Sequence, residues 1–293
     1  GGWGRGGRSR REAAELRAKE GDRHVLGGAA EGVGEAVVQA TGAGWVFWSR
    51  RYDPHGRETG TGIKAALQRQ GVVARSFAGA LLHEPWTVRT QSGSPYKIFT
   101  AFWRAACTLP VQAFLRPAPE KLVFAAPVPA LEALRVPPEQ YGLLPTTPDW
   151  AGGLRETWVP GEAQACAQLA DFCQHDQADY AQTRDFPAKE STSGLSPFLR
   201  FGHVSPARVW ESAQARPNPE KFLTELGWRD FAWSLLFETP DLASRNLRPE
   251  FDAMPWRTDP KGPAAWQHGQ TGHPPVDSGM RQLWLSSYER RVV

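Results

Sequence analysis

The sequence predicts an α/β region joined by a long proline-rich linker to an all-helical region. Helix-like and strand-like patterns alternate over residues 12–77, nine of the 25 prolines lie between Pro110 and Pro148, and helical patterns dominate after Trp158. Because 293 residues exceed the usual size of one domain, two domains are expected.

The α/β region is expected to form a parallel sheet. Three helix-like and three strand-like stretches alternate along it, in the order residues 12–21, 24–26, 31–44, 45–48, 62–71 and 72–77. Strands that alternate with helices pair in parallel, because the chain must cross over between them. Three strands are few for an independent sheet, so the sequence predicts an incomplete Rossmann-like domain.

Changes in composition suggest four segments. Residues 1–11 are rich in Gly and Arg without periodicity, which predicts a disordered head. The partial α/β domain follows over residues 12–107. Residues 108–157 form the linker, because prolines at this density prevent regular helix or sheet. Residues 158–293 form the helical domain.

The composition is that of a globular protein without a membrane anchor. A net charge of +3 neither requires nor excludes a nucleic-acid partner, because the distribution of charge matters more than its sum. No apolar run approaches the ~20 residues needed to cross a bilayer. The three cysteines (Cys107, Cys166 and Cys173) lack metal-ligand spacing and leave one unpaired. We therefore expect a cytoplasmic protein with no metal site and no membrane partner.

One candidate binding motif is the run Thr192-Ser193-Gly194-Leu195-Ser196, followed by Pro197 and an apolar stretch. Ser196 is a favourable N-cap, and proline suits the first position of a helix. Clustered hydroxyls and free N–H groups at a helix start suit a phosphate or pyrophosphate. Taken alone, the run also fits a capped helix without a ligand, which is the commoner case.

Two further sets of residues suggest ligand chemistry. Tyr180 and Arg184 precede a proline turn and could close on a phosphate, although Arg184 and Asp185 also fit a plain surface ion pair. Glu225 and Trp228 are three residues apart and share one helical face, where an indole and a carboxylate suit a flat heterocycle. The alternative there is a core tryptophan beside an ion pair between Glu225 and Arg229.

The order and spacing of these motifs resemble the DNA photolyase/cryptochrome family, and in particular its class I cyclobutane-pyrimidine-dimer photolyases. The resemblance rests on stretches that cover most of residues 31–284: 45–54, 62–71, 75–86, 94–107, 158–162, 180–187, 192–206, 222–231, 251–260 and 271–284. It implies that the helical domain binds FAD.

The resemblance also implies roles for individual residues. Those expected at FAD are Tyr180, Thr192, Ser193, Gly194, Leu195, Ser196, Phe222, Glu225 and Arg229. Those expected at DNA are Arg184, Glu225, Trp228 and Arg291. Glu225 and Trp228 would contact the pyrimidine dimer, and Trp256 would be the outer tryptophan of the chain that photoreduces the flavin.

The implied activity is that of a deoxyribodipyrimidine photo-lyase. Reduced, light-excited FAD would donate an electron that splits the cyclobutane ring of a dimer flipped out of the DNA stack, as photolyases do. The implied partner is UV-damaged DNA, bound by a monomer through phosphates and therefore in a salt-dependent way.

Both ends of the sequence depart from the family pattern. Residues 1–11 do not match its first strand, and LSSYERRVV at residues 285–293 does not continue its C-terminal part, although Arg291 is matched. We therefore expect a truncated chain. The alternatives are a catalytically dead fragment with residual phosphate or DNA binding, and a cryptochrome-like blue-light receptor. No clear pattern supports an antenna chromophore of the folate or deazaflavin type.

Overall fold

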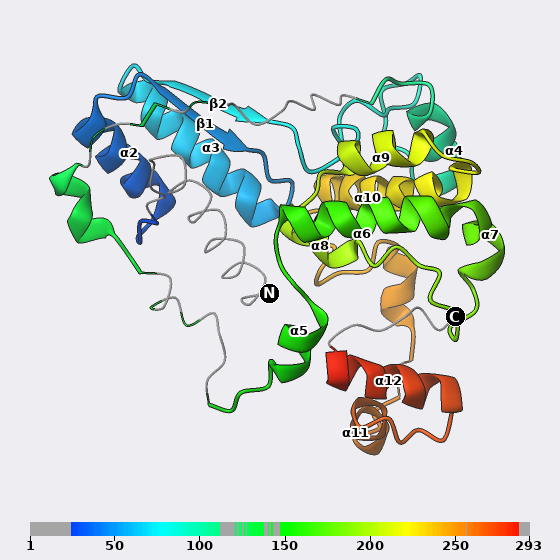
Figure 1. The fold of residues 1–293 in the computed structure, drawn as a ribbon. Helices are drawn as coiled ribbons and strands as arrows, with labels where there is room; N and C mark the ends of the chain where they lie inside the picture. The colour runs from blue at the N-terminus through cyan, green and yellow to red at the C-terminus, as the bar shows by residue number, and fades with distance from the viewer. Residues whose placement is uncertain are drawn as a thin grey trace.

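The computed structural model describes residues 25–111, 147–255 and 257–286, and parts of 121–142 (Figure 1). The head at residues 1–11 and the helix expected at 12–21 lie outside the described residues. The α/β part and the segment after it contain α2 (Ala30–Thr41), β1 (Trp45–Ser49), α3 (Pro54–Arg69), β2 (Val73–Phe77), α4 (Phe99–Ala106) and the 3-10 helix η1 (Pro129–Leu134).

The two strands pair in parallel, as the alternating pattern predicts. Trp45 lies opposite Val73 at one end of the pair, and Ser49 lies opposite Phe77 at the other. Helices α2 and α3 pack together against one face of the sheet, where Leu67 is fully buried. The connection through α3 returns the chain to the start of β2, because parallel strands need a crossover.

Val25 and Leu26, the described part of the strand expected at residues 24–26, do not join this sheet. Leu26 instead forms an isolated antiparallel bridge to Arg135, beside η1. The backbone N–H of Val136 donates to the carbonyl of Val25 at 2.9 Å, and that of Gly27 donates to Leu134 at 2.8 Å. The prediction was wrong here because a distant part of the linker supplies the backbone partners of this short apolar stretch.

The region after the linker is helical, as predicted. It contains α5 (Gly152–Thr157), α6 (Glu162–His175), the 3-10 helix η3 (Gln177–Asp179), α7 (Tyr180–Thr183), α8 (Ser196–Phe201), α9 (Pro206–Gln214), α10 (Glu220–Glu238), the 3-10 helix η4 (Pro249–Ala253), α11 (Lys261–Gln267) and α12 (Pro274–Ser286). None of the described helices is both long and apolar enough to span a bilayer.

Helix α10 joins the two regions. One of its faces packs into the helical core beside α6 and α9, through Phe222, Leu223 and Leu226. Farther along, Phe231 packs against α4, where Phe102 is 2% exposed. A single 19-residue helix therefore carries side chains that face both regions.

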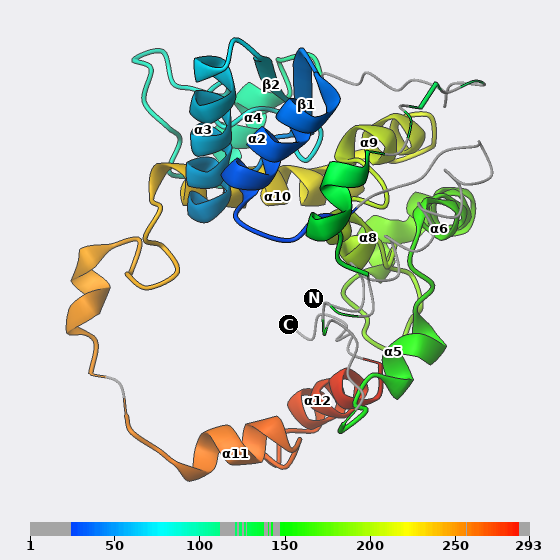
Figure 2. The same cartoon turned by 90° about the vertical axis from the view of Figure 1, so that its left-hand side faces the viewer.

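Helices α11 and α12 lie at the edge of the molecule, away from α10 (Figure 2). Helix α12 packs against α5 and α11, and none of its described residues belongs to the main buried cluster of the helical region. The Asp277 carboxylate fixes the turn before α12, because it accepts hydrogen bonds from the Thr271 backbone N–H at 2.8 Å, the Thr271 hydroxyl at 2.7 Å and the Gly272 N–H at 3.0 Å.

Candidate functional site

The predicted phosphate motif forms the loop that leads into α8. Gly194 adopts a φ of +62°, a left-handed conformation that glycine adopts without steric cost. The helix begins at Ser196. Its N-cap residue is Leu195, whose side chain makes no capping hydrogen bond. The Ser196 N-cap prediction was therefore wrong by one residue. The loop still places its hydroxyl residues at the start of a helix, as expected.

A buried aromatic cluster connects this loop to α10. The ring of Tyr180 lies 5.5 Å from that of Phe222, and both contact Phe172 of α6. Leu195, which is 2% exposed, belongs to the same buried cluster. Tertiary packing thus brings together three predicted site positions that are far apart in the sequence.

Two of the predicted charged residues meet beside this cluster. The Arg184 guanidinium donates to the Glu225 carboxylate and lies 5.3 Å from the centre of the Tyr180 ring. Burial by itself would lower the pKa of Arg184, but the hydrogen bond from Arg184 to Glu225 and the nearby negative charge raise it. The Lys221 ammonium lies 3.9 Å from the same carboxylate. Arg184 also contacts Asp185 at 3.3 Å, so the surface pair exists beside the Glu225 pair.

Trp228 presents an exposed aromatic surface one turn after Glu225. Its side chain is 47% exposed, unlike the core tryptophan of the alternative interpretation. The ring stacks on Phe99 of α4, with 3.6 Å between ring centroids and 12° between ring planes. An indole and a carboxylate therefore lie on the same side of α10, as their spacing predicts.

Arg229 turns away from Glu225. Its Nη1 donates to the Ala80 carbonyl at 2.5 Å, so the intrahelical ion pair of the alternative interpretation does not form. Burial lowers the pKa of Arg229, and Arg200 lowers it further, although the nearby Asp230 opposes both effects. Arg229 thus lies at the junction between the two regions.

Two models of known families match the chain. The model for DNA photolyase matches residues 11–122, and the model for the FAD binding domain of DNA photolyase matches residues 222–291. The chain belongs to the DNA photolyase/cryptochrome family. The fold expectation is thereby confirmed: a photolyase α/β domain with parallel strands and a helical FAD-binding domain.

Curated relatives agree with this family assignment. A deoxyribodipyrimidine photo-lyase from Agrobacterium fabrum is 42% identical over 278 residues, which are 91% of this chain and 56% of the relative. A Synechococcus deoxyribodipyrimidine photo-lyase is 33% identical over 84% of this chain and 53% of its own length. The chain thus spans about half the length of these relatives.

A solved photolyase shares the fold over almost the whole chain. The class III photolyase from Agrobacterium tumefaciens superimposes with a TM-score of 0.92 at 38% identity, covering 99% of this chain and 61% of the other. These comparisons establish the photolyase/cryptochrome family, but they do not specifically support the class I assignment.

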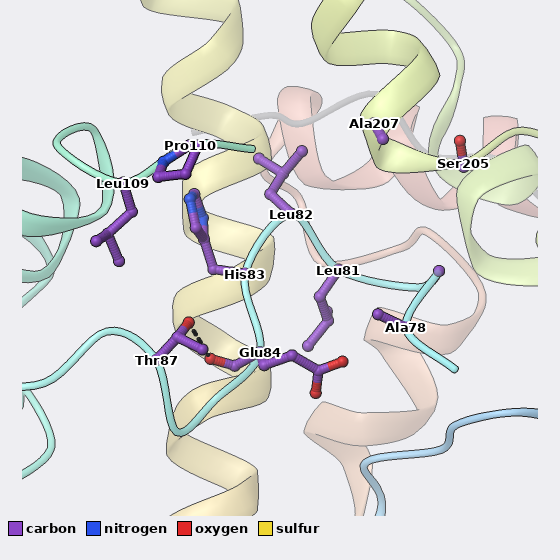
Figure 3. Close-up of a pocket in the computed structure, with 11 residues that line it drawn as sticks. Ala78, Leu81, Leu82, His83, Glu84, Thr87, Leu109, Pro110, Ser205 and Ala207 are labelled. Atoms are coloured by element: carbon purple, nitrogen blue, oxygen red, sulfur yellow. Dashed lines mark hydrogen bonds between the residues drawn. The ribbon is translucent and has the colours of Figure 1, made fainter. Parts of the chain in front are cut away.

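A junction that no sequence motif indicated includes Asp230 of α10. The Asp230 carboxylate accepts backbone hydrogen bonds from Leu82 and His83, both at 2.9 Å. Figure 3 shows the loop after β2 crossing the yellow helix α10, where His83 and Glu84 line a cavity of about 340 Å³. A single buried Asp gave no sequence signal, because its partners are backbone groups of another region.

Two predicted residues, Trp256 and Arg291, lie outside the described part of the chain. Of the described ones, Tyr180, Arg184, Leu195, Phe222 and Glu225 lie close together. The rest of the 192–196 run forms the loop into α8. Trp228 stacks on Phe99, and Arg229 is directed toward the α/β domain.

Proposed function

We propose that this chain carries the lesion-binding and FAD-phosphate-binding parts of a deoxyribodipyrimidine photo-lyase, which splits cyclobutane pyrimidine dimers in DNA. The observation that carries this proposal is the arrangement of Glu225 and Trp228 on one side of α10, with Arg184 bound to the carboxylate. The similarity to named photo-lyases supports the same activity.

Trp228, Glu225 and Arg184 would each contribute a different contact to damaged DNA. The exposed face of Trp228 would stack on the flipped pyrimidine dimer. Glu225 would accept hydrogen bonds from the edge of the dimer. Arg184, whose side chain is 10% exposed, would exchange part of its contact with Glu225 for a DNA phosphate. The resulting affinity would fall as salt rises.

For FAD, the loop before α8 fits the phosphate end of the cofactor. The Ser191 hydroxyl is buried and has no hydrogen-bond partner among the described residues. A buried hydroxyl is expected to be hydrogen-bonded, and a bound phosphate would satisfy it. Thr192, Ser193, Gly194, Leu195 and Ser196 would surround the phosphates, and Tyr180, Phe222, Glu225 and Arg229 would line the adjoining cofactor wall. When bound, reduced FAD would supply the electron that opens the cyclobutane ring.

The photolyase class of this chain and its binding partner are also matters of proposal. The motifs resemble class I enzymes, whereas the likeness to the Agrobacterium tumefaciens structure favours class III. UV-damaged DNA is the proposed partner of a monomeric protein. A blue-light receptor is the second candidate, because Arabidopsis cryptochrome-2 is 28% identical over 86% of this chain.

The test uses purified protein that is loaded with FAD, freed of unbound flavin by gel filtration, reduced with dithionite and mixed with a duplex that contains one thymine dimer. We expect flavin absorbance to stay with the protein through gel filtration, and repair to occur only in light. Glu225→Gln should lower the repair rate, whereas Arg208→Gln on the surface of α9 should not. Flavin binding without repair would favour the receptor, and colourless protein without repair would favour the inactive fragment.

A further inference from the structure

The stacking of Phe99 on Trp228 joins the α/β domain to the proposed lesion surface. Phe99 is the first residue of α4, and Trp228 belongs to α10. Their ring centroids are 3.6 Å apart, which is closer than the 4.5–7 Å usual for aromatic pairs. The two rings therefore overlap directly, and Phe99 covers one face of the indole.

Phe99 belongs to a helix that is packed firmly against α10. Phe102 and Ala106 of the same helix are buried against Phe231 of α10, with 5.3 Å between the Phe102 and Phe231 rings. The ring of Phe231 also meets Phe99 edge to face at 5.8 Å. This packing restricts the movement of Phe99, and through the stack it restricts the rotation of Trp228.

We propose that Phe99 is a positioning residue for lesion recognition. It fixes the Trp228 indole so that one face is covered and the opposite face is presented to one ring of the pyrimidine dimer. This inference rests on the proposed function, because it deepens the role assigned there to Trp228. A preorganised ring loses less conformational freedom on binding, which favours the stacked lesion over undamaged DNA.

The first experiment measures affinity for a duplex with one thymine dimer and for the same duplex without it. Phe99→Leu removes the flat ring and should lower the discrimination between the two duplexes roughly threefold to tenfold. Phe99→Tyr keeps the ring and should retain the discrimination. Phe77→Leu is the matched control: it replaces a half-exposed phenylalanine of β2 that pairs with Phe47 outside the proposed site, and it should not change discrimination.

The second experiment observes Trp228 directly and does not depend on DNA. In protein labelled with 5-fluorotryptophan, the ¹⁹F resonance of Trp228 is assigned through Trp228→Phe. Phe99→Leu should shift and broaden this resonance, whereas the control Phe77→Leu should leave it close to its original position.

The outcomes separate the two proposals. If the wild-type protein does not prefer the dimer duplex, the proposed function and the inference both fail. If the wild type prefers it and Trp228→Ala abolishes the preference, but Phe99→Leu discriminates as well as the wild type, only the positioning role is overturned. An unchanged Trp228 resonance in Phe99→Leu would also overturn it.

Discussion

Asp230 shows at the scale of one residue how burial opposes hydrogen bonding. The carboxyl group is 2% exposed and receives two backbone hydrogen bonds, which favour its charged form. Burial disfavours that form more strongly and raises the pKa of Asp230 to about 7. The Nδ1 atom of His83 lies 3.8 Å from the Oδ2 atom of Asp230. The charge of Arg229 lowers the pKa of Asp230, and the charge of Glu84 raises it.

This raised pKa predicts how stability depends on pH. Below the unfolded pKa of 3.8 both states hold the proton, and the contribution of Asp230 is fully present. As pH rises from there to about 7, only the unfolded state loses its proton, so the contribution falls by about 4 kcal/mol. Burial lowers the pKa of His83, which opposes this trend because stability from His83 is lost as pH falls.

Asp230→Asn isolates the contribution of the carboxyl group, because the amide does not ionise in this range. The stability of the wild type relative to the variant should decrease as pH rises from about 5 to about 8. Urea unfolding of both proteins across this range measures the difference. If the difference in stability between the two proteins did not change with pH, Asp230 would have the same pKa in the folded and unfolded states, which would contradict the prediction.

At the scale of elements, the close approach of α4 and α10 depends on Gly227. A Cβ atom at Gly227 would lie 2.3 Å from a carbon of the Trp103 ring, which is too close for two non-bonded atoms. The absence of a side chain thus lets Trp103 lie against α10, between Phe99 at 6.2 Å and Trp210 of α9 at 6.0 Å. These rings connect α4, α9 and α10.

Gly227→Ala should therefore destabilise the protein. Alanine favours a helix interior by about 1 kcal/mol over glycine, but overpacking against Trp103 costs about 1–3 kcal/mol. Gly34→Ala in α2 is the matched control, because nothing lies within 4 Å of its Cβ position, and it should be neutral or stabilising. Thermal unfolding of both variants measures this, and equal stabilisation by the two would contradict the packing argument.

At the scale of the whole molecule, the two domains are tied together along α10. Besides the contacts of Arg229 and Asp230, Arg57 of α3 donates to the Phe237 carbonyl at 2.9 Å, and Arg89 pairs with Glu238 at 2.6 Å. The Arg57 guanidinium also lies 3.9 Å from the centre of the Phe237 ring. Such contacts make separate unfolding of either domain costly.

We therefore expect the two domains to unfold together. In hydrogen exchange at increasing urea, peptides from residues 45–77 and 162–238 should open with the same free energy. The double variant Arg57→Ala/Arg89→Ala should separate them, whereas Arg208→Ala, which removes a surface pair on α9, should not. Different opening free energies in the wild type would contradict this coupling.

The sequence by itself determined what depends on near neighbours. Alternating patterns predicted the parallel pairing of β1 with β2, and the spacing of Glu225 and Trp228 placed them on one helical side, because both follow from the periodicity of a few residues. Motif order also predicted the family that the comparisons established.

The tertiary structure decided which partner each side chain takes. Arg229 binds the Ala80 carbonyl, 149 positions away, rather than Glu225 on its own helix. Phe99 covers Trp228, and Leu26 bridges Arg135 instead of joining the sheet. Such contacts depend on how distant elements pack and on which backbone groups they leave to be satisfied, and no local pattern in the sequence encodes either.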